Sequence, residues 1–167
     1  MTKLNNQQQT KPIILVVDDA YGNILMLARG LAKDYEVLIA VSGKEALTIL
    51  AQEQKPDLIL LDVMMPEMDG YEVCRQIKNN ETIKDIPIIF LTAKEAVWDQ
   101  QLGFNLGAVD YITKPIQMPL LLARVAVHIR LKLKSDRLEQ LAMLDSLTDV
   151  GNRRALNKIL TLSLIHI

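Results

Sequence analysis

Short apolar runs alternate with longer segments of helical periodicity from Lys11 to Pro115. A run of about four to eight apolar, β-branched residues predicts a strand, and apolar positions recurring every three or four residues predict a helix. Three runs, IILVV, LILL and IIFL, contain no polar residue, which is typical of parallel strands covered by helices on both faces. The run YEVLIAV contains Glu36, which favours a position nearer the edge of the sheet. The pattern predicts an α/β fold with five parallel strands, at Ile13–Asp18, Tyr35–Val41, Asp57–Asp62, Pro87–Thr92 and Val109–Thr113.

The segments between these strands predict four helices, at Ala20–Lys33, Lys44–Gln54, Tyr71–Asn79 and Val97–Leu106. Ser42 stands at an N-cap position with Glu45 three residues later, which is a capping-box pattern. Gly107 follows the last of these helices, where a terminating glycine is common. Because crossovers between parallel strands are right-handed, a small doubly wound sheet is the topology that fits.

The pattern changes after Pro115. No glycine occurs from Met118 to Leu144, and Pro119 is acceptable in a first helical turn, so one long helix is predicted. Steps of four, three, four and three residues separate five positions that form a heptad seam interrupted by one lysine: Val127, Leu131, Lys134, Leu138 and Leu141. Such a seam suits dimerisation or signal transmission, and an ordinary amphipathic surface helix is the alternative.

Charge divides the chain in the same place. Residues 1–115 contain 11 Lys and Arg against 16 Asp and Glu, whereas residues 116–167 contain 8 against 4. The near-neutral total, and the lack of a helix-turn-helix pattern after the basic helix, exclude a dedicated nucleic-acid binder. Cys74 is the only cysteine, so no internal disulfide can form. No apolar run approaches the ~20 residues of a membrane span, and a cytoplasmic protein is expected.

Chemically active residues stand at the carboxyl ends of four predicted strands. Asp18 and Asp19 follow the first strand, Asp62 ends the third, Thr92 ends the fourth, and Lys114 follows the fifth. Ligands of open α/β sheets bind outside these strand ends. Neighbouring carboxylates repel one another unless a cation is present, and a dense set of oxygen ligands suits Mg²⁺. Lys114 and the Thr92 hydroxyl would then contact an anion beside the metal, although neither GxxxxGK[ST] nor GxGxxG is present.

Four motifs resemble the receiver domain of two-component response regulators: VVDDA at 16–20, LLDVMMPEMDG at 60–70, LTA at 91–93 and DYITKP at 110–115. The resemblance covers residues 11–130. It implies a flavodoxin-like, five-stranded sheet of strand order 2-1-3-4-5, with helices on both faces. It also implies that the chain catalyses its own phosphorylation on one aspartate, taking the phosphoryl group from a histidine kinase or phosphotransfer protein.

The resemblance assigns roles to the acidic residues. Asp62 matches the phosphoacceptor, at the end of the third strand. Asp19 and Asp62 match the direct Mg²⁺ ligands, together with the backbone carbonyl of Met64, and Asp18 matches a ligand that acts through water.

The remaining positions match the switch of the family. Thr92 matches the hydroxyl that binds the phosphoryl group, and Lys114 matches the amine that pairs with it. Tyr111 matches the aromatic residue that turns inward when the threonine moves, and Lys114–Pro115 matches a cis peptide bond. The resemblance implies a homodimer on phosphorylation, formed through the fourth helix, fifth strand, fifth helix and linker helix.

Residues 145–154, DSLTDVGNRR, resemble the opening D-x-L-T-x-L-x-N-R-R of a GGDEF diguanylate cyclase domain. Taken alone, this segment predicts a capped turn followed by a helix at Arg154–Leu162. The resemblance implies that the full-length parent makes cyclic di-GMP from two GTP. This chain has no GGDEF signature, so we expect only self-phosphorylation and self-dephosphorylation, without cyclase activity.

These observations divide the chain into five parts. We expect a disordered lead-in (1–10), a receiver domain (11–130), a linker helix (131–144), the truncated start of a GGDEF domain (145–161) and a tail (162–167). The tail LSLIHI can be encoded by a transposon end used in shotgun sequencing, so we hypothesise that it is a sequencing-adapter artefact.

Two other functions fit parts of the pattern. A stand-alone receiver would act as a binding or phosphorelay module without cyclase output. A Mg²⁺-dependent phosphohydrolase would need its nucleophilic aspartate at the first strand with a second aspartate two residues later, whereas Asp18 and Asp19 are adjacent.

Overall fold

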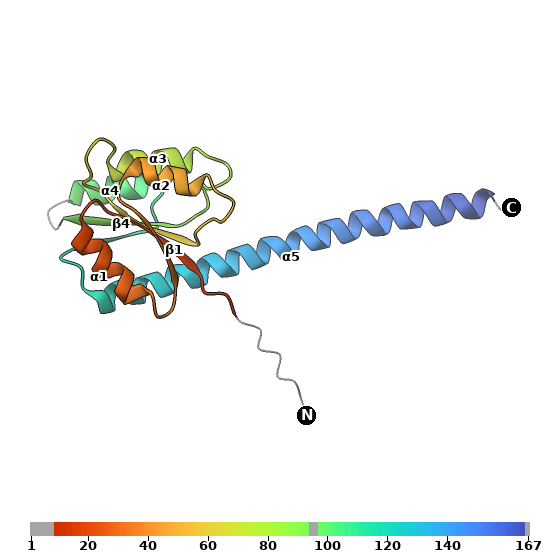
Figure 1. Cartoon of the computed structure of the whole chain (residues 1–167). Helices are drawn as coiled ribbons and strands as arrows, with labels where there is room; N and C mark the ends of the chain where they lie inside the picture. The colour runs from red at the N-terminus through yellow and green to blue at the C-terminus, as the bar shows by residue number, and fades with distance from the viewer. Residues whose placement is uncertain (1–8, 94–96, 166–167) are drawn as a thin grey trace, which may run out of the picture. The chain divides into compact units, whose positions relative to one another are not determined.

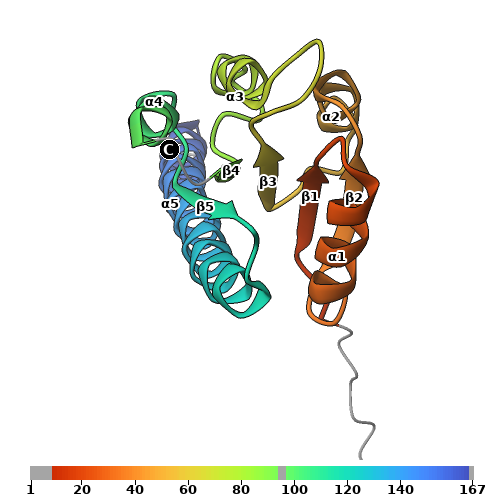
Figure 2. The ribbon, with the colours of Figure 1, turned by 90° about the vertical axis from the view of Figure 1, so that its left-hand side faces the viewer.

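The computed structural model describes residues 9–93 and 97–165, with the side chains of 97–99, 148–150 and 152–165 left undescribed. The predicted lead-in (1–10) falls almost wholly outside the described residues. Strands and helices alternate along the chain before the long C-terminal helix (Figure 1). Five strands form one parallel sheet of order β2-β1-β3-β4-β5, which confirms the predicted fold (Figure 2). The strands are β1 (Ile13–Val17), β2 (Glu36–Ala40), β3 (Leu58–Asp62), β4 (Ile88–Ala93) and β5 (Asp110–Lys114).

Helices cover both faces of this sheet (Figure 2). They are α1 (Tyr21–Leu31), α2 (Gly43–Leu50), α3 (Gly70–Lys78), α4 (Val97–Asn105) and α5 (Met118–Ile165). One buried cluster joins the sheet to α2 and α3, and a second joins it to α1 and the first turns of α5. Side chains alternate between these clusters along each central strand. In β1, for example, Leu15 and Val17 belong to the first cluster, and Ile14 and Val16 belong to the second. This two-sided burial explains the uninterrupted apolar runs.

Two side-chain caps begin the helices that follow β2 and β3. The Ser42 hydroxyl accepts a hydrogen bond from Glu45 N (3.1 Å), as the capping-box pattern predicts. The return bond differs from the usual pattern, because Glu45 Oε2 accepts from Val41 N (3.3 Å) and not from Ser42 N. The carboxylate of Asp69 accepts from Glu72 N (2.9 Å) and begins α3. These bonds satisfy amide groups that a helix start leaves without partners.

The long C-terminal helix is confirmed, but it does not stop where the sequence predicted. α5 runs without a break from Met118 to Ile165, so the predicted capped turn at Asp145 is wrong. No proline occurs after Pro119 and Gly151 is the only glycine in the helix, so nothing ends its hydrogen-bond ladder. The chain divides into two compact units, Met1–Arg130 and Leu131–Ile167. Among the described residues, no helix is long and apolar enough to cross a membrane.

Candidate functional site

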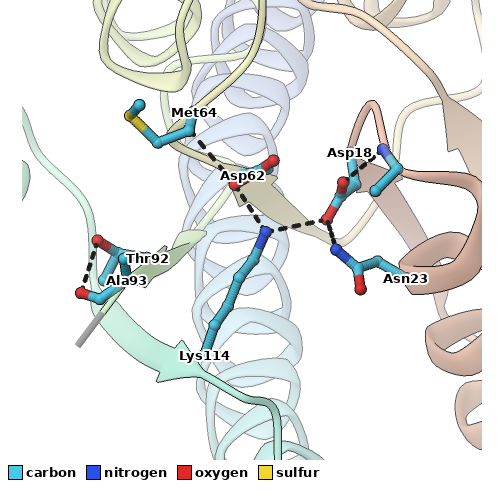
Figure 3. Close-up of polar contacts among 8 residues, drawn as sticks. Asp18, Asn23, Asp62, Met64, Thr92, Ala93 and Lys114 are labelled. Carbon is cyan, nitrogen blue, oxygen red and sulfur yellow. Dashed lines mark hydrogen bonds and ion pairs between the residues drawn. The ribbon is translucent and has the colours of Figure 1, made fainter.

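Three charged residues meet at the carboxyl end of the sheet (Figure 3). Asp62 ends β3, Lys114 ends β5, and Asp18 follows directly after β1. The Lys114 ammonium lies 3.0 Å from Asp62 Oδ1 and 3.4 Å from Asp18 Oδ2. Both carboxylates are buried, and the lysine is more accessible. The parallel sheet therefore brings these predicted site residues together, as expected from their places at the strand ends.

Asp18 is held by α1 and by the residue that precedes it, as well as by Lys114. Its Oδ1 accepts from Ala20 N (2.8 Å), and its Oδ2 accepts from the side-chain amide of Asn23 (3.2 Å). These hydrogen bonds fix the buried carboxylate in one orientation. Sequence reasoning missed Asn23, although a polar residue just inside the helix after the Asp-Asp pair was a usable signal.

Asp19 completes an acidic cluster with Asp18 and Asp62. Carboxylate oxygens of the three residues lie within 4.8 Å of one another. Asp19 is exposed, and its carboxylate makes no hydrogen bond or ion pair with any described residue. Hard oxygen donors at this spacing, one of them open to solvent, are compatible with Mg²⁺ binding.

The cluster shifts the proton affinities of its members. Burial raises the pKa of the Asp62 carboxyl to about 6, and the negative charge of Asp18 adds to this rise. Two groups lower the pKa of Asp62 and so limit this rise. Lys114 does so through its hydrogen bond and its positive charge, and the Met64 amide does so through its hydrogen bond. Burial alone would lower the pKa of Lys114, but its hydrogen bonds and ion pairs with Asp62 and Asp18 outweigh burial and raise it. A divalent cation beside Asp62 would favour its ionised form.

Met64 and Gly70 shape the loop that follows β3. The Met64 amide donates to Asp62 Oδ1 (3.4 Å), while its side chain is exposed. Gly70 N donates to Val63 O (2.9 Å), and a Cβ at position 70 would lie only 2.3 Å from the backbone oxygen of Asp62. The loop can therefore return this closely across the end of β3, without displacing it, only if residue 70 has no side chain.

Thr92 and Tyr111 lie apart from the charged group. The Thr92 hydroxyl is bonded to Ala93 O (3.5 Å), and among the described residues it has no bond to Asp62 or Lys114. The Tyr111 ring packs edge-on against Phe104 of α4, with ring centroids 5.6 Å apart. Both residues line a small cavity between α4, β4 and β5. The peptide bond between Lys114 and Pro115 is cis, as the resemblance implied.

A second polar network, which the sequence did not reveal, joins β5 to α5. Arg124 donates to Tyr111 O (2.6 Å) and to Asp110 Oδ1 (3.3 Å), while His128 Nε2 lies 3.0 Å from Asp110 Oδ2. The residues are separated by up to 18 positions and follow no local motif. Their pairing follows from the packing of α5 beside β5.

Comparison with known proteins agrees with this geometry. The sequence matches the family described as response regulator receiver domain over residues 14–126. The chain belongs to the response regulator receiver family. A solved structure of Vibrio cholerae chemotaxis protein CheY4 matches this receiver with a TM-score of 0.66 and 31% identity, covering 70% of this chain and 98% of that one.

Two curated relatives are longer than this receiver. A Vibrio cholerae protein named "Probable cyclic di-GMP phosphodiesterase" is 49% identical over 136 residues, which is 81% of this chain and 31% of the relative. Response regulator PleD of Caulobacter vibrioides is 46% identical over 128 residues, which is 76% of this chain and 28% of the relative. The chain thus spans less than a third of the length of these relatives.

Proposed function

We propose that this receiver is phosphorylated on Asp62, with Mg²⁺, by a sensor histidine kinase or a phosphotransfer protein. The observation that carries the proposal is the position of Asp62, 3.0 Å from Lys114 and within 4.8 Å of two further carboxylates. A histidine kinase or phosphotransfer protein is the kind of partner with which receivers of this family interact.

Asp62 would act as the nucleophile. Its Oδ1 accepts hydrogen bonds from Lys114 and Met64, whereas Oδ2 accepts none from the described residues and is free to attack phosphorus. The new bond joins Oδ2 to phosphorus, and the bond between phosphorus and the donor nitrogen breaks. Lys114 would neutralise charge on the transferred group, so the receiver contributes mainly position and electrostatics.

The metal would be held by groups already in place. Asp19 and Asp62 would bind Mg²⁺ directly, the Met64 carbonyl would be a third ligand, and Asp18 would act through water. The ion supplies positive charge to the phosphoryl oxygens. The fixed orientation of Asp18, and the open carboxylate of Asp19, support this division.

Thr92 and Tyr111 would change position when Asp62 is phosphorylated. The Thr92 hydroxyl would leave the carbonyl of Ala93 and donate to a phosphoryl oxygen, and Tyr111 would then turn into the cavity that both residues line. Because Tyr111 is joined to α5 through Arg124, this movement would reach α4, β5 and α5 together. Phosphorylation would then favour a homodimer through this face and the linker helix.

The output that fits best is synthesis of cyclic di-GMP by the full-length parent. The cyclase-like motif at 145–154 supports this output, and the name of the Vibrio cholerae relative supports a role in cyclic di-GMP metabolism. That relative is named as a phosphodiesterase, so degradation of cyclic di-GMP is the second candidate. Receiver similarity alone does not choose between outputs, because a Bacillus subtilis transcriptional regulatory protein, PhoP, is 45% identical over 118 residues.

The test is the intact mass of the protein after incubation with a small acyl phosphate, with and without Mg²⁺. We expect one phosphoryl group to be added only with Mg²⁺, and none to be added to Asp62→Asn. Asp69→Asn is the matched control, because asparagine also caps a helix and Asp69 lies outside the acidic cluster. Addition to Asp62→Asn, or none to the folded parent, would contradict the proposal.

A further inference from the structure

The second unit presents an apolar row that no described residue of the chain covers. Its leucines, at positions 131, 138 and 141, are 57%, 67% and 51% exposed, and Lys134 continues the same spacing. We call Leu131, Lys134, Leu138 and Leu141 the α5 seam. Steps of three, four and three residues are the repeat by which α-helices pair as coiled coils. A second copy of the chain carries a helix with the same repeat.

The charges at the flanking g and e positions, apart from Lys134 within the seam itself, favour a parallel pair of copies. Leu131 and Leu138 occupy a positions, so Arg130 and Arg137 occupy g positions, while Ser135 and Ala142 occupy e positions. In a parallel pair, g positions face e positions of the other helix, so each arginine faces a neutral residue. An antiparallel pair over the same stretch would place g beside g, with Arg130 against Arg137 of the second copy. The parallel arrangement therefore avoids this repulsion.

Lys134 is the residue that such a pair would find hardest to accommodate. It is exposed and has no ion pair among the described residues, whereas Lys132 pairs with Asp136 at 2.5 Å. In a parallel pair in register, Lys134 lies at a d position and faces Lys134 of the second copy. A lysine at a core position lowers the stability of a coiled coil.

We propose that Lys134 weakens self-association of the α5 seam, so that two copies do not dimerise through the seam alone. The seam then pairs only when another contact brings two copies together. This regulatory role rests on the proposed function, because phosphorylation of Asp62 would supply that other contact. The lysine thus makes dimerisation conditional, and three leucines supply the apolar contact once the pair forms.

The first test is sedimentation equilibrium of the unphosphorylated full chain and of Lys134→Leu. We expect the variant to dimerise at least about tenfold more tightly, because a buried leucine replaces two facing charges. Lys132→Leu is the matched control, since it adds the same side chain two residues away, outside the seam. Equal dimerisation of the two variants would overturn the proposal.

The second test shows which residues face each other. Lys134→Glu mixed with the parent chain should form heterodimers in preference to either homodimer, and added salt should weaken this preference. A mixture without such a preference would overturn the parallel, in-register pairing on which the proposal depends. Intact mass of the same samples after acyl phosphate treatment distinguishes failure of the proposed phosphorylation of Asp62 from failure of the proposed role of Lys134. Absence of phosphorylation refutes the proposed function, whereas the Lys134→Leu comparison needs no phosphorylation.

Discussion

Lys114 Nζ contacts Asp62 Oδ1 at 3.0 Å, so the last residue of β5 meets the last residue of β3, 52 positions earlier in the chain. β4 lies between these two strands in the sheet, and the lysine side chain reaches past it. This single contact places a fixed positive charge beside the atom that we expect to accept phosphorus.

Replacing Lys114 by methionine should slow phosphorylation of Asp62 by about 100-fold, because a positioned charge that stabilises a transition state has roughly this effect. The rate can be followed by incubating the protein with a small acyl phosphate, quenching samples at successive times and measuring their intact mass. Lys44→Met, an exposed lysine in the first turn of α2, should react at the parental rate. A Lys114→Met rate close to that of Lys44→Met would refute a role for the ammonium group.

The metal-free protein should lose stability as the pH rises through about 6. The pKa of Asp62 is raised from 3.8 to about 6 in the folded state, so folding favours its protonated form. The resulting stabilisation is complete below about pH 4 and is lost as the pH rises through the folded-state pKa. Asp62→Asn should therefore be more stable than the parent by about 1–3 kcal/mol at pH 7.

Urea unfolding of both proteins at pH 4.5 and pH 7, with a chelator present, measures this difference. The raised pKa of Lys114 does not contribute in this window, because a raised lysine pKa affects stability only at alkaline pH. A stability difference between parent and variant that does not change with pH would contradict the assignment.

Magnesium should stabilise the folded protein, and Asp19→Asn should remove most of this effect. Binding to the folded state alone adds about 1.4 kcal/mol when the ion is at ten times its Kd. Since Asp19 is exposed and has no bond to a described residue, its replacement should leave the metal-free stability nearly unchanged. Thermal unfolding with Mg²⁺ and with a chelator gives both quantities, and Asp69→Asn should keep the full increment. An unchanged increment in Asp19→Asn would exclude Asp19 as a ligand.

Gly70→Ala should destabilise the protein by about 1–3 kcal/mol, which is typical of overpacking. The new Cβ would meet the backbone oxygen of Asp62 at 2.3 Å, so the end of β3 must move. Phosphorylation should slow as well, because Asp62 is the displaced residue. Gly22→Ala in α1 is the control: its Cβ would meet nothing within 4 Å, and alanine favours a helix more than glycine does. Urea unfolding should order the stabilities as Gly22→Ala, parent, Gly70→Ala.

Much of this fold could be predicted from the sequence, because the buried strands are apolar on both faces and the site residues follow them directly. The order of the sheet also agreed with the resemblance, and Glu36 lies on the edge strand β2. The course of α5 past Asp145 could not be predicted in the same way. Asp and Ser favour turns locally, yet a helix ends only where its backbone hydrogen bonds are interrupted.

Several contacts that depend on the exact three-dimensional geometry could not be predicted from the sequence either. Asp69 was recognisable as a cap only once the start of α3 was known, and the need for glycine at position 70 arises from a backbone atom of β3. The bond of Thr92 to Ala93 depends on the rotamer of one hydroxyl, which no sequence pattern records.

The bonds of Arg124 and Glu45 have a consequence for the two edges of the sheet. β5 and β2 are the two edges of the sheet, where backbone groups without partners could bind a strand of another molecule. Arg124 occupies the carbonyl of Tyr111 on β5, and Glu45 occupies the amide of Val41 just after β2. At these two places a side chain of the same molecule already holds the group that an added strand would need. Each edge of the sheet therefore offers one fewer unpaired backbone group to a strand of another molecule.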